Sequence, residues 1–192
     1  MIWFTSDTHL GHMGILLHQA ARLNAFECIE EMDAQLIDNI NRVVGRDDTL
    51  YHLGDFCWQA SRAGHYRQRL NVRQLHMLRG NHDAPSLKQH CSTFQDMLCK
   101  KFPSYIIGPR LKIHMLHYPM ISWDALHYGG IHLYGHCHGS MEDQLNQWFP
   151  GRRAMDVGID NIYKLTGEWR PISLNEVIAR LASKSGPVEV PA

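Results

Sequence analysis

The chain has 192 residues, of which 19 are Lys or Arg and 19 are Asp or Glu, so its formal net charge is zero. A neutral chain lacks the positive field that holds a protein on duplex DNA, which argues against a protein that coats nucleic acid but not against one that cuts a phosphoester locally. The length fits one domain with a sizeable core. We expect that domain to cover residues 1–184 and a flexible tail to follow at 185–192.

Two residue counts narrow the chemistry. The five cysteines form no C-x-x-C pair, which predicts neither a disulfide framework nor a zinc ribbon and favours a reducing, cytoplasmic setting. No leader sequence and no bilayer-spanning run is expected. The 14 histidines are unusually many, and imidazole is a common metal ligand.

In the first half of the chain, apolar patterns predict three strands and two helices. The β-prone run at 2–5 predicts the first strand. A helix is predicted between residues 27 and 44, because apolar side chains recur there at spacings of three and four. A second strand at 49–53, a helix at 58–70 and a buried strand at 74–78 follow.

In the second half, a polar helix or loop is expected from Pro85 to about Cys99. Two β-prone runs at 104–107 and 111–116 flank a Gly-Pro-Arg turn and predict a hairpin. Strands are predicted at 131–134 and 154–159. The intervening residues 139–153 are interpreted as a loop that either overhangs a site or packs on a second subunit. A capping box at Ser173 and Glu176 predicts a last helix to about Ser183. The alternation of strands and helices predicts an α/β layered domain, and the hairpin makes its sheets mixed.

Five of the predicted strands end in side chains that bind metals: Asp7 and His9, Asp55, Asn81 and His82, His117, and His136 and His138. Two pairs are spaced i, i+2, and an extended backbone would put both members of each pair on one side. This mixture of nitrogen and oxygen donors suits Mn²⁺, Fe, Zn²⁺ or Ni²⁺ better than Mg²⁺ or Ca²⁺ alone. Seven ligands are more than one tetrahedral ion can bind, and they suit two ions that share a carboxylate. Such two-metal sites are used in phosphoester hydrolysis.

The ordered set Asp7-x-His9, Gly54-Asp55, Gly80-Asn81-His82-Asp83, His117 and Gly135-His136-Cys137-His138 resembles the calcineurin-like metallophosphoesterase superfamily. The resemblance runs from residue 7 to about 138. It implies a four-layer αββα sandwich with two mixed sheets and a dinuclear metal centre, for which Mn²⁺ is the first choice. By this resemblance one metal would be held by Asp7, His9, Asp55 and His138, and the other by Asp55, Asn81, His117 and His136.

The same resemblance implies roles for further residues. His82 matches the family's histidine that contacts the phosphate and protonates the leaving oxygen, with Asp83 orienting it. The nucleophile would be a hydroxide that bridges the two metals. His12 and Arg79 are weaker substrate-binding candidates. A capping or surface role is open for His12, and Arg79 is either a phosphate ligand or a charged residue beside a turn.

The residues after Asp55 help to choose a substrate. Gly54-Asp55 is followed by Phe56-Cys57-Trp58 and not by the Val-Asp-Arg-Gly of the phosphoprotein phosphatases, so a protein phosphatase is not favoured. We expect a phosphodiesterase or phosphatase that hydrolyses a small nucleotide-like phosphoester. A nuclease for short single-stranded nucleic acid and a non-catalytic metal-binding scaffold are the alternatives. Extended nucleic-acid binding and membrane binding are not expected, and a homo-oligomer stays open.

Overall fold

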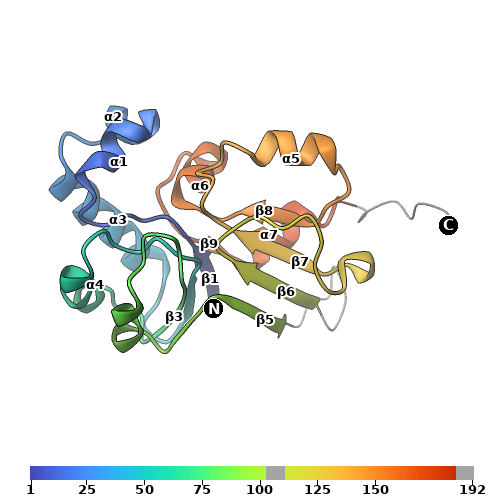
Figure 1. The fold of residues 1–192 in the computed structure, drawn as a ribbon, viewed down its shortest axis with the longest axis horizontal. Helices are drawn as coiled ribbons and strands as arrows, with labels where there is room; N and C mark the ends of the chain where they lie inside the picture. Colours follow the sequence, from blue (N-terminus) through green and yellow to red (C-terminus); the bar gives the residue numbers. More distant parts are fainter. Residues whose placement is uncertain (103–110, 185–192) are drawn as a thin grey trace.

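Two mixed sheets pack face to face in the computed structural model, which describes residues 1–102 and 111–184 (Figure 1). Within these residues the first sheet has the order β4-β3-β2-β1-β9 and the second the order β5-β6-β7-β8. Neighbouring strands run parallel except for the antiparallel pairs β1–β9 and β5–β6. The mixed sheets predicted from the sequence are confirmed.

The strands are short. The first sheet consists of β1 (Ile2–Thr5), β2 (Thr49–His52), β3 (Gln74–Leu78), β4 (Thr93–Gln95) and β9 (Ile172–Ser173). The second consists of β5 (Met97–Phe102), β6 (Leu111–Leu116), β7 (Ile131–Tyr134) and β8 (Ala154–Asp156).

Helices cover the outer faces of both sheets (Figure 1). The helices of the described residues are α1 (Met13–His18), α2 (Ala20–Ala25), α3 (Ile29–Val43), α4 (Ala63–Arg69), α5 (Glu142–Trp148), α6 (Ile159–Thr166) and α7 (Leu174–Leu181). Unlike the others, α7 places all its buried apolar side chains in the core between the sheets. The described residues also include three short 3₁₀ turns: η1 (Ala60–Arg62) just before α4, η2 (Pro85–His90) between β3 and β4, and η3 (Leu126–Tyr128) between β6 and β7.

The alternation of side chains along each strand builds the layers. Trp3 points into the core that the first sheet forms with α3, while its neighbour Phe4 points into the core between the sheets. Leu50 and Tyr51 divide in the same way. On the far side, Tyr134 of β7 packs against Leu145 of α5. Helix, sheet, sheet and helix therefore form the expected αββα sandwich.

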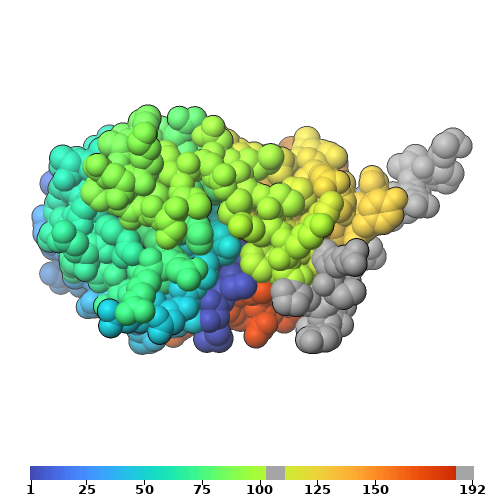
Figure 2. Space-filling model, turned by 90° about the horizontal axis from the view of Figure 1, so that it is seen from below, coloured from blue at the N-terminus to red at the C-terminus, as the bar shows by residue number. Residues whose placement is uncertain are grey.

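The first and last strands of the described chain, β1 and β9, pair at one edge of the first sheet. Phe4 of β1 pairs with Ile172 of β9, which leads into α7. In Figure 2 the dark blue start of the chain accordingly lies beside the red segment that contains these elements. The capping box that opens α7 is present, since Ser173 Oγ accepts the backbone N–H of Glu176 and the Glu176 carboxylate accepts that of Ser173.

Most predicted strands are confirmed, but several predictions need correction. Residues 139–153 are not a loop, because α5 lies there and buries Leu145 against the second sheet. The strand predicted at 154–159 ends at Asp156, and α6 begins at Ile159. The region after Pro85 contains η2, β4 and the start of β5, and it is β5 that pairs with β6. The predicted strand at 104–107 and the tail at 185–192 lie outside the described residues.

Candidate functional site

The carboxyl ends of parallel strands from both sheets bring the predicted ligands together. Asp7, His9 and His138 form one group, and Asp55, His117 and His136 form a second, with the ligand atoms of each group within 4.8 Å of one another. The side-chain oxygen of Asn81 joins the second group, 3.0 Å from His117 Nε2 and 2.9 Å from His136 Nδ1. All seven predicted metal ligands thus lie at one edge of the sandwich.

The Asp55 carboxylate lies between the two groups. Its Oδ2 is 3.5 Å from Nε2 of His9 in the first group and 3.4 Å from Nε2 of His117 in the second. Its other oxygen accepts the backbone N–H of His82 at 2.9 Å. Burial alone would raise the pKa of Asp55, but the hydrogen bond and charge of His117 hold this pKa well below its ordinary value. The carboxylate is therefore an anion in reach of both imidazoles.

The first group fits a metal because of a buried nitrogen that has no partner. His9 is 3% exposed, and its Nε2 has no hydrogen-bond partner. Leaving such an atom unpaired costs free energy unless another ligand takes it up. Burial lowers the pKa of His9 to about 2, so the ring is neutral and keeps a lone pair for a cation.

The second group fits a metal for an electrostatic reason. His117 Nδ1 donates to the carbonyl oxygen of Leu53 at 2.8 Å, so its Nε2 faces the oxygens of Asn81 and Asp55. A nitrogen that faces two oxygens needs a positive charge, from either a proton or a cation. Burial would lower the pKa of His117, but Asp55 and Asp7 outweigh it and raise the pKa to about 9. The negative charge of Asp55 and Asp7 therefore favours a bound cation next to His117 Nε2.

The backbone at the site is left-handed. Among the described residues, six non-glycine residues have positive φ, and five are candidate ligands: Asp7 (58°), His9 (49°), Asp55 (56°), His136 (68°) and His138 (49°). The sequence analysis expected the paired ligands to converge on extended backbone, which is wrong. They converge because alternate residues turn into the αL region, where Asp and His are tolerated better than most side chains. Such strain is typical of functional sites.

Two residues that the sequence analysis missed hold the first group in place. The His138 Nδ1–H donates to Asp160 Oδ2 at 2.7 Å, which leaves Nε2 facing Asp7. The guanidinium of Arg22, fully buried, binds both Asp160 oxygens at 2.8 and 2.7 Å. It also donates to the carbonyl oxygens of Asp7 and Thr8. Carboxylate partners of this kind fix the orientation of ligand imidazoles. No local motif marks Arg22, because its partner lies 138 residues away.

The buried acids Asp83 and Asp156 support the backbone. One Asp83 oxygen accepts the N–H groups of Asp55 and Gly80, and the other accepts that of Phe56. Asp83 thus ties two ligand loops together, which corrects the expectation that it orients the His82 ring. Asp156 accepts the N–H groups of Gly139 and Gly158, which supports the loop that follows His138.

The weaker substrate-binding candidates lie on opposite flanks of the ligand groups. His12 stacks on the exposed Trp58 with ring centroids 3.8 Å apart, and Trp58 also lies 5.1 Å from the exposed His82. Arg79 lies beside the second group and pairs with Asp96 at 2.6 Å. Both side chains are exposed enough to meet a ligand, and their contribution to binding stays a prediction.

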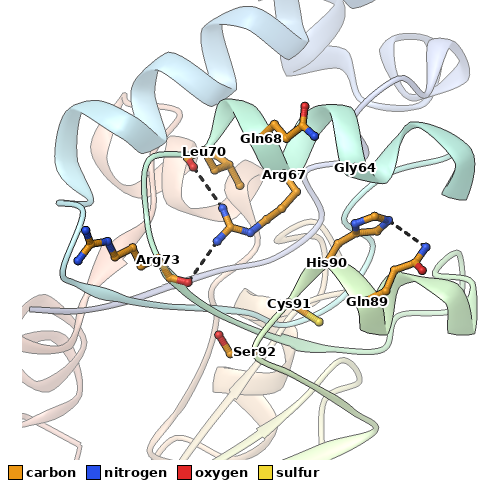
Figure 3. Close-up of a pocket in the computed structure, with 9 residues that line it drawn as sticks. All are labelled: Gly64, Arg67, Gln68, Leu70, Arg73, Gln89, His90, Cys91 and Ser92. Atoms are coloured by element: carbon orange, nitrogen blue, oxygen red, sulfur yellow. Dashed lines mark hydrogen bonds between the residues drawn. The ribbon is translucent and has the colours of Figure 1, made fainter.

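A separate pocket between α4 and η2 is not part of this site (Figure 3). Its central side chain, Arg67, donates to the carbonyl oxygens of Leu70, Val72 and Arg73. The guanidinium therefore fixes the turn after α4. Figure 3 labels the nine lining residues, Cys91 and Ser92 among them, and none of them is a candidate ligand.

The calcineurin-like phosphoesterase family model matches residues 1–181. The chain belongs to this family. Its members are metal-dependent phosphoester hydrolases that typically use two divalent metals, and the two ligand groups agree with that. Among the described residues no helix combines the length and apolarity needed to cross a membrane.

Relatives of the chain cover nearly its whole length. It is 28% identical over 185 residues to an uncharacterized protein of Methanocaldococcus jannaschii, covering 95% of this chain and 92% of the relative. It is 27% identical over 196 residues to the gene 66 protein of Mycobacterium phage L5, covering 82% of this chain and 86% of that protein. The crystal structure of an Aquifex aeolicus protein of unknown function superposes with a TM-score of 0.67 at 22% identity, covering 94% and 98% of the two chains. That likeness shows a shared fold.

We expect Gly135→Ala to empty the first ligand group. A Cβ at this position would lie 2.1 Å from Ser6 Oγ and 2.4 Å from Asp7 Oδ2, so the Asp7 carboxylate would have to move. Mn²⁺ content after loading and desalting, measured by plasma mass spectrometry, should fall by at least one ion per chain. The exposed Gly45, where a Cβ meets only the Asp48 side chain at 3.3 Å and no candidate ligand, provides the control Gly45→Ala. Unchanged metal content in Gly135→Ala would contradict this packing argument.

Proposed function

We propose that this chain hydrolyses small phosphoesters, diesters in particular, with two divalent cations bound at the two ligand groups. The observation that carries the proposal is the position of Asp55 Oδ2, 3.5 Å from an imidazole of one group and 3.4 Å from an imidazole of the other. A single buried carboxylate in reach of both groups suits two ions that share it.

In this proposal Asp55 is the shared ligand. Asp7, His9 and His138 complete one site, and Asn81, His117 and His136 complete the other. The donors mix oxygen and imidazole nitrogen without thiolate, which suits Mn²⁺ first and also Fe, Zn²⁺ or Ni²⁺. When bound, two such cations supply Lewis acidity, lower the pKa of water and neutralise charge on the phosphoryl oxygens.

The protein's own groups would handle the leaving side of the reaction. Water adds to phosphorus, the bond from phosphorus to the leaving oxygen breaks, and that oxygen takes a proton. His82 is suited to give this proton, because its exposed ring stands 5.5 Å from the His9 ring while its backbone N–H is held by Asp55. His12 and Trp58 border the same flank and would contact the departing group.

A small nucleotide-like ester is the proposed substrate class. A chain with zero net charge lacks the global positive field that attracts a long polyanion. Exposed aromatic side chains instead flank the ligand groups, with Trp58 at 45% exposure and Tyr118 at 42%. Aromatic faces next to a phosphate site suit bases or other flat substituents.

The protein loaded with Mn²⁺ should hydrolyse bis(p-nitrophenyl) phosphate faster than p-nitrophenyl phosphate, because a diester places a group on each flank. The absorbance of the released p-nitrophenolate measures both reactions. Hydrolysis of neither compound by protein shown to contain metal would overturn the proposal and favour a non-catalytic scaffold.

His82→Ala should lose most turnover, on the order of 10²-fold in kcat, because a positioned acid contributes about that much. Both ions should remain bound, since the ligand groups do not include the His82 ring. Steady-state kinetics and metal analysis on the same preparation test this. The exposed His127 of η3 supplies the matched control His127→Ala, which should keep full activity. Loss of metal from His82→Ala would show that this residue serves the centre structurally.

Asp55→Asn should strip the centre of at least one ion, because the amide removes the negative charge that two cations would share. The amide keeps nearly the shape of the carboxylate, so the fold should survive. Metal analysis and circular dichroism separate the two effects. Asp38→Asn on the exposed face of α3 is the control. Two ions per chain in Asp55→Asn would refute a shared ligand.

A further inference from the structure

A pocket opens beside the second ligand group, whereas the His82 ring lies near the first group, 5.5 Å from the His9 ring, and beside Trp58. It is lined by Arg79, Gly80, Asn81, Asp83, Asp96, Leu116 and Tyr118, and its volume is about 410 Å³. We call it the Tyr118 pocket. Asn81 belongs both to this lining and to the second ligand group, where its oxygen lies 2.9 Å from His136 Nδ1. A group attached to a phosphate at the centre would therefore have direct access to the pocket.

Tyr118 supplies an aromatic wall next to the centre. Its ring lies 4.7 Å from the ring of His136 and 5.1 Å from that of His117, both edge to face. The residue is nevertheless 42% exposed. A ring fixed by two neighbours and still open to solvent is suited to stacking against a flat ligand.

The rest of the lining selects the kind of ligand. Arg79 and Asp96 pair at 2.6 Å through one nitrogen and one oxygen, which leaves further N–H donors and a second acceptor oxygen in the pocket. Because Asp96 neutralises Arg79, a second phosphate gains little there. A lipid chain would need a predominantly apolar lining, whereas Arg79, Asn81, Asp83 and Asp96 bring polar groups to this one. The pocket therefore favours a ligand that is flat enough to stack on Tyr118, uncharged beside the Arg79–Asp96 pair, and equipped with both donors and acceptors on its edge.

We propose that the Tyr118 pocket binds the nucleobase of the substituent that stays on phosphorus, so that the substrate is a nucleoside phosphodiester. This inference rests on the proposed function. The leaving group would lie on the opposite flank with His82 and Trp58, and the retained nucleoside would stack on Tyr118. Arg79 and Asp96 would meet the polar edge of the base, so Arg79 contacts substrate through the base instead of the phosphate. A monoester substrate has no retained substituent and leaves the pocket unused, whereas the nucleoside monophosphate product of diester hydrolysis would keep its base in the pocket.

Two esters with the same leaving group isolate the pocket. Thymidine 5′-(p-nitrophenyl phosphate) carries a nucleoside on the retained side, whereas methyl p-nitrophenyl phosphate carries only a methyl group. A mutation that disturbs the metals or the leaving side should change kcat/KM for both esters alike. The ratio of the two kcat/KM values therefore reports on the retained side alone. In Tyr118→Ala we expect this ratio to fall roughly tenfold, the loss typical of one stacked base, and in Tyr118→Phe to stay within about twofold of the unmodified protein. Tyr128→Ala removes a tyrosine that is 92% exposed on η3 and should leave the ratio unchanged.

A binding measurement separates this inference from the proposed function. Thymidine 5′-monophosphate should bind the Mn²⁺-loaded protein about tenfold more weakly after Tyr118→Ala, as measured by calorimetry. An unchanged ratio of the two esters together with unchanged affinity for the monophosphate would overturn the Tyr118 pocket while leaving hydrolysis intact. Absence of hydrolysis of both esters would overturn the proposed function, and the affinities would then decide the pocket alone.

Discussion

The structure depends on keeping the Asp55 carboxylate charged although it is almost completely removed from water. Three kinds of partner make this possible: the imidazole of His117, the backbone N–H of His82, and the turn that Asp83 fastens by accepting three N–H groups. A buried anion without such partners would take up a proton or unfold its surroundings. These partners can reach Asp55 only because the strands end beside it and the loops turn tightly through left-handed backbone.

The two sheets contribute unequal parts to that point. The first sheet supplies the loops with four candidate ligands, Asp7, His9, Asp55 and Asn81, and the second supplies the loops with three, His117, His136 and His138. Contacts across the sheets hold them in register, since His117 donates to the Leu53 carbonyl and the His136 N–H contacts the Asp7 carboxylate. The apolar interior between the sheets thus serves as the support that fixes the separation of acids and imidazoles.

The sequence predicted the layered fold and the ligand set because both leave local marks. Alternating apolar residues reveal strands, and ligand-type side chains follow five of them. It did not predict Arg22 or Asp160, since a buried ion pair between distant residues has no local pattern. The sequence also predicted a loop at 139–153. The helix α5 in this range is short and mostly polar, and Leu145 is its main buried apolar side chain, so no apolar periodicity marks it. The extended backbone expected at the ligand pairs failed for a related reason: φ angles at strand ends are set by tertiary contacts.

The Arg22–Asp160 pair joins residues 138 positions apart, and the Asp7–His136 contact joins residues 129 apart. During synthesis the chain therefore cannot assemble this edge until α6 has left the ribosome, by which time both sheets are nearly complete. Contacts this far apart in sequence form slowly and late. A nascent or truncated chain that ends before residue 160 lacks the carboxylate that orients His138, so the first ligand group is complete only after α6 has packed against it.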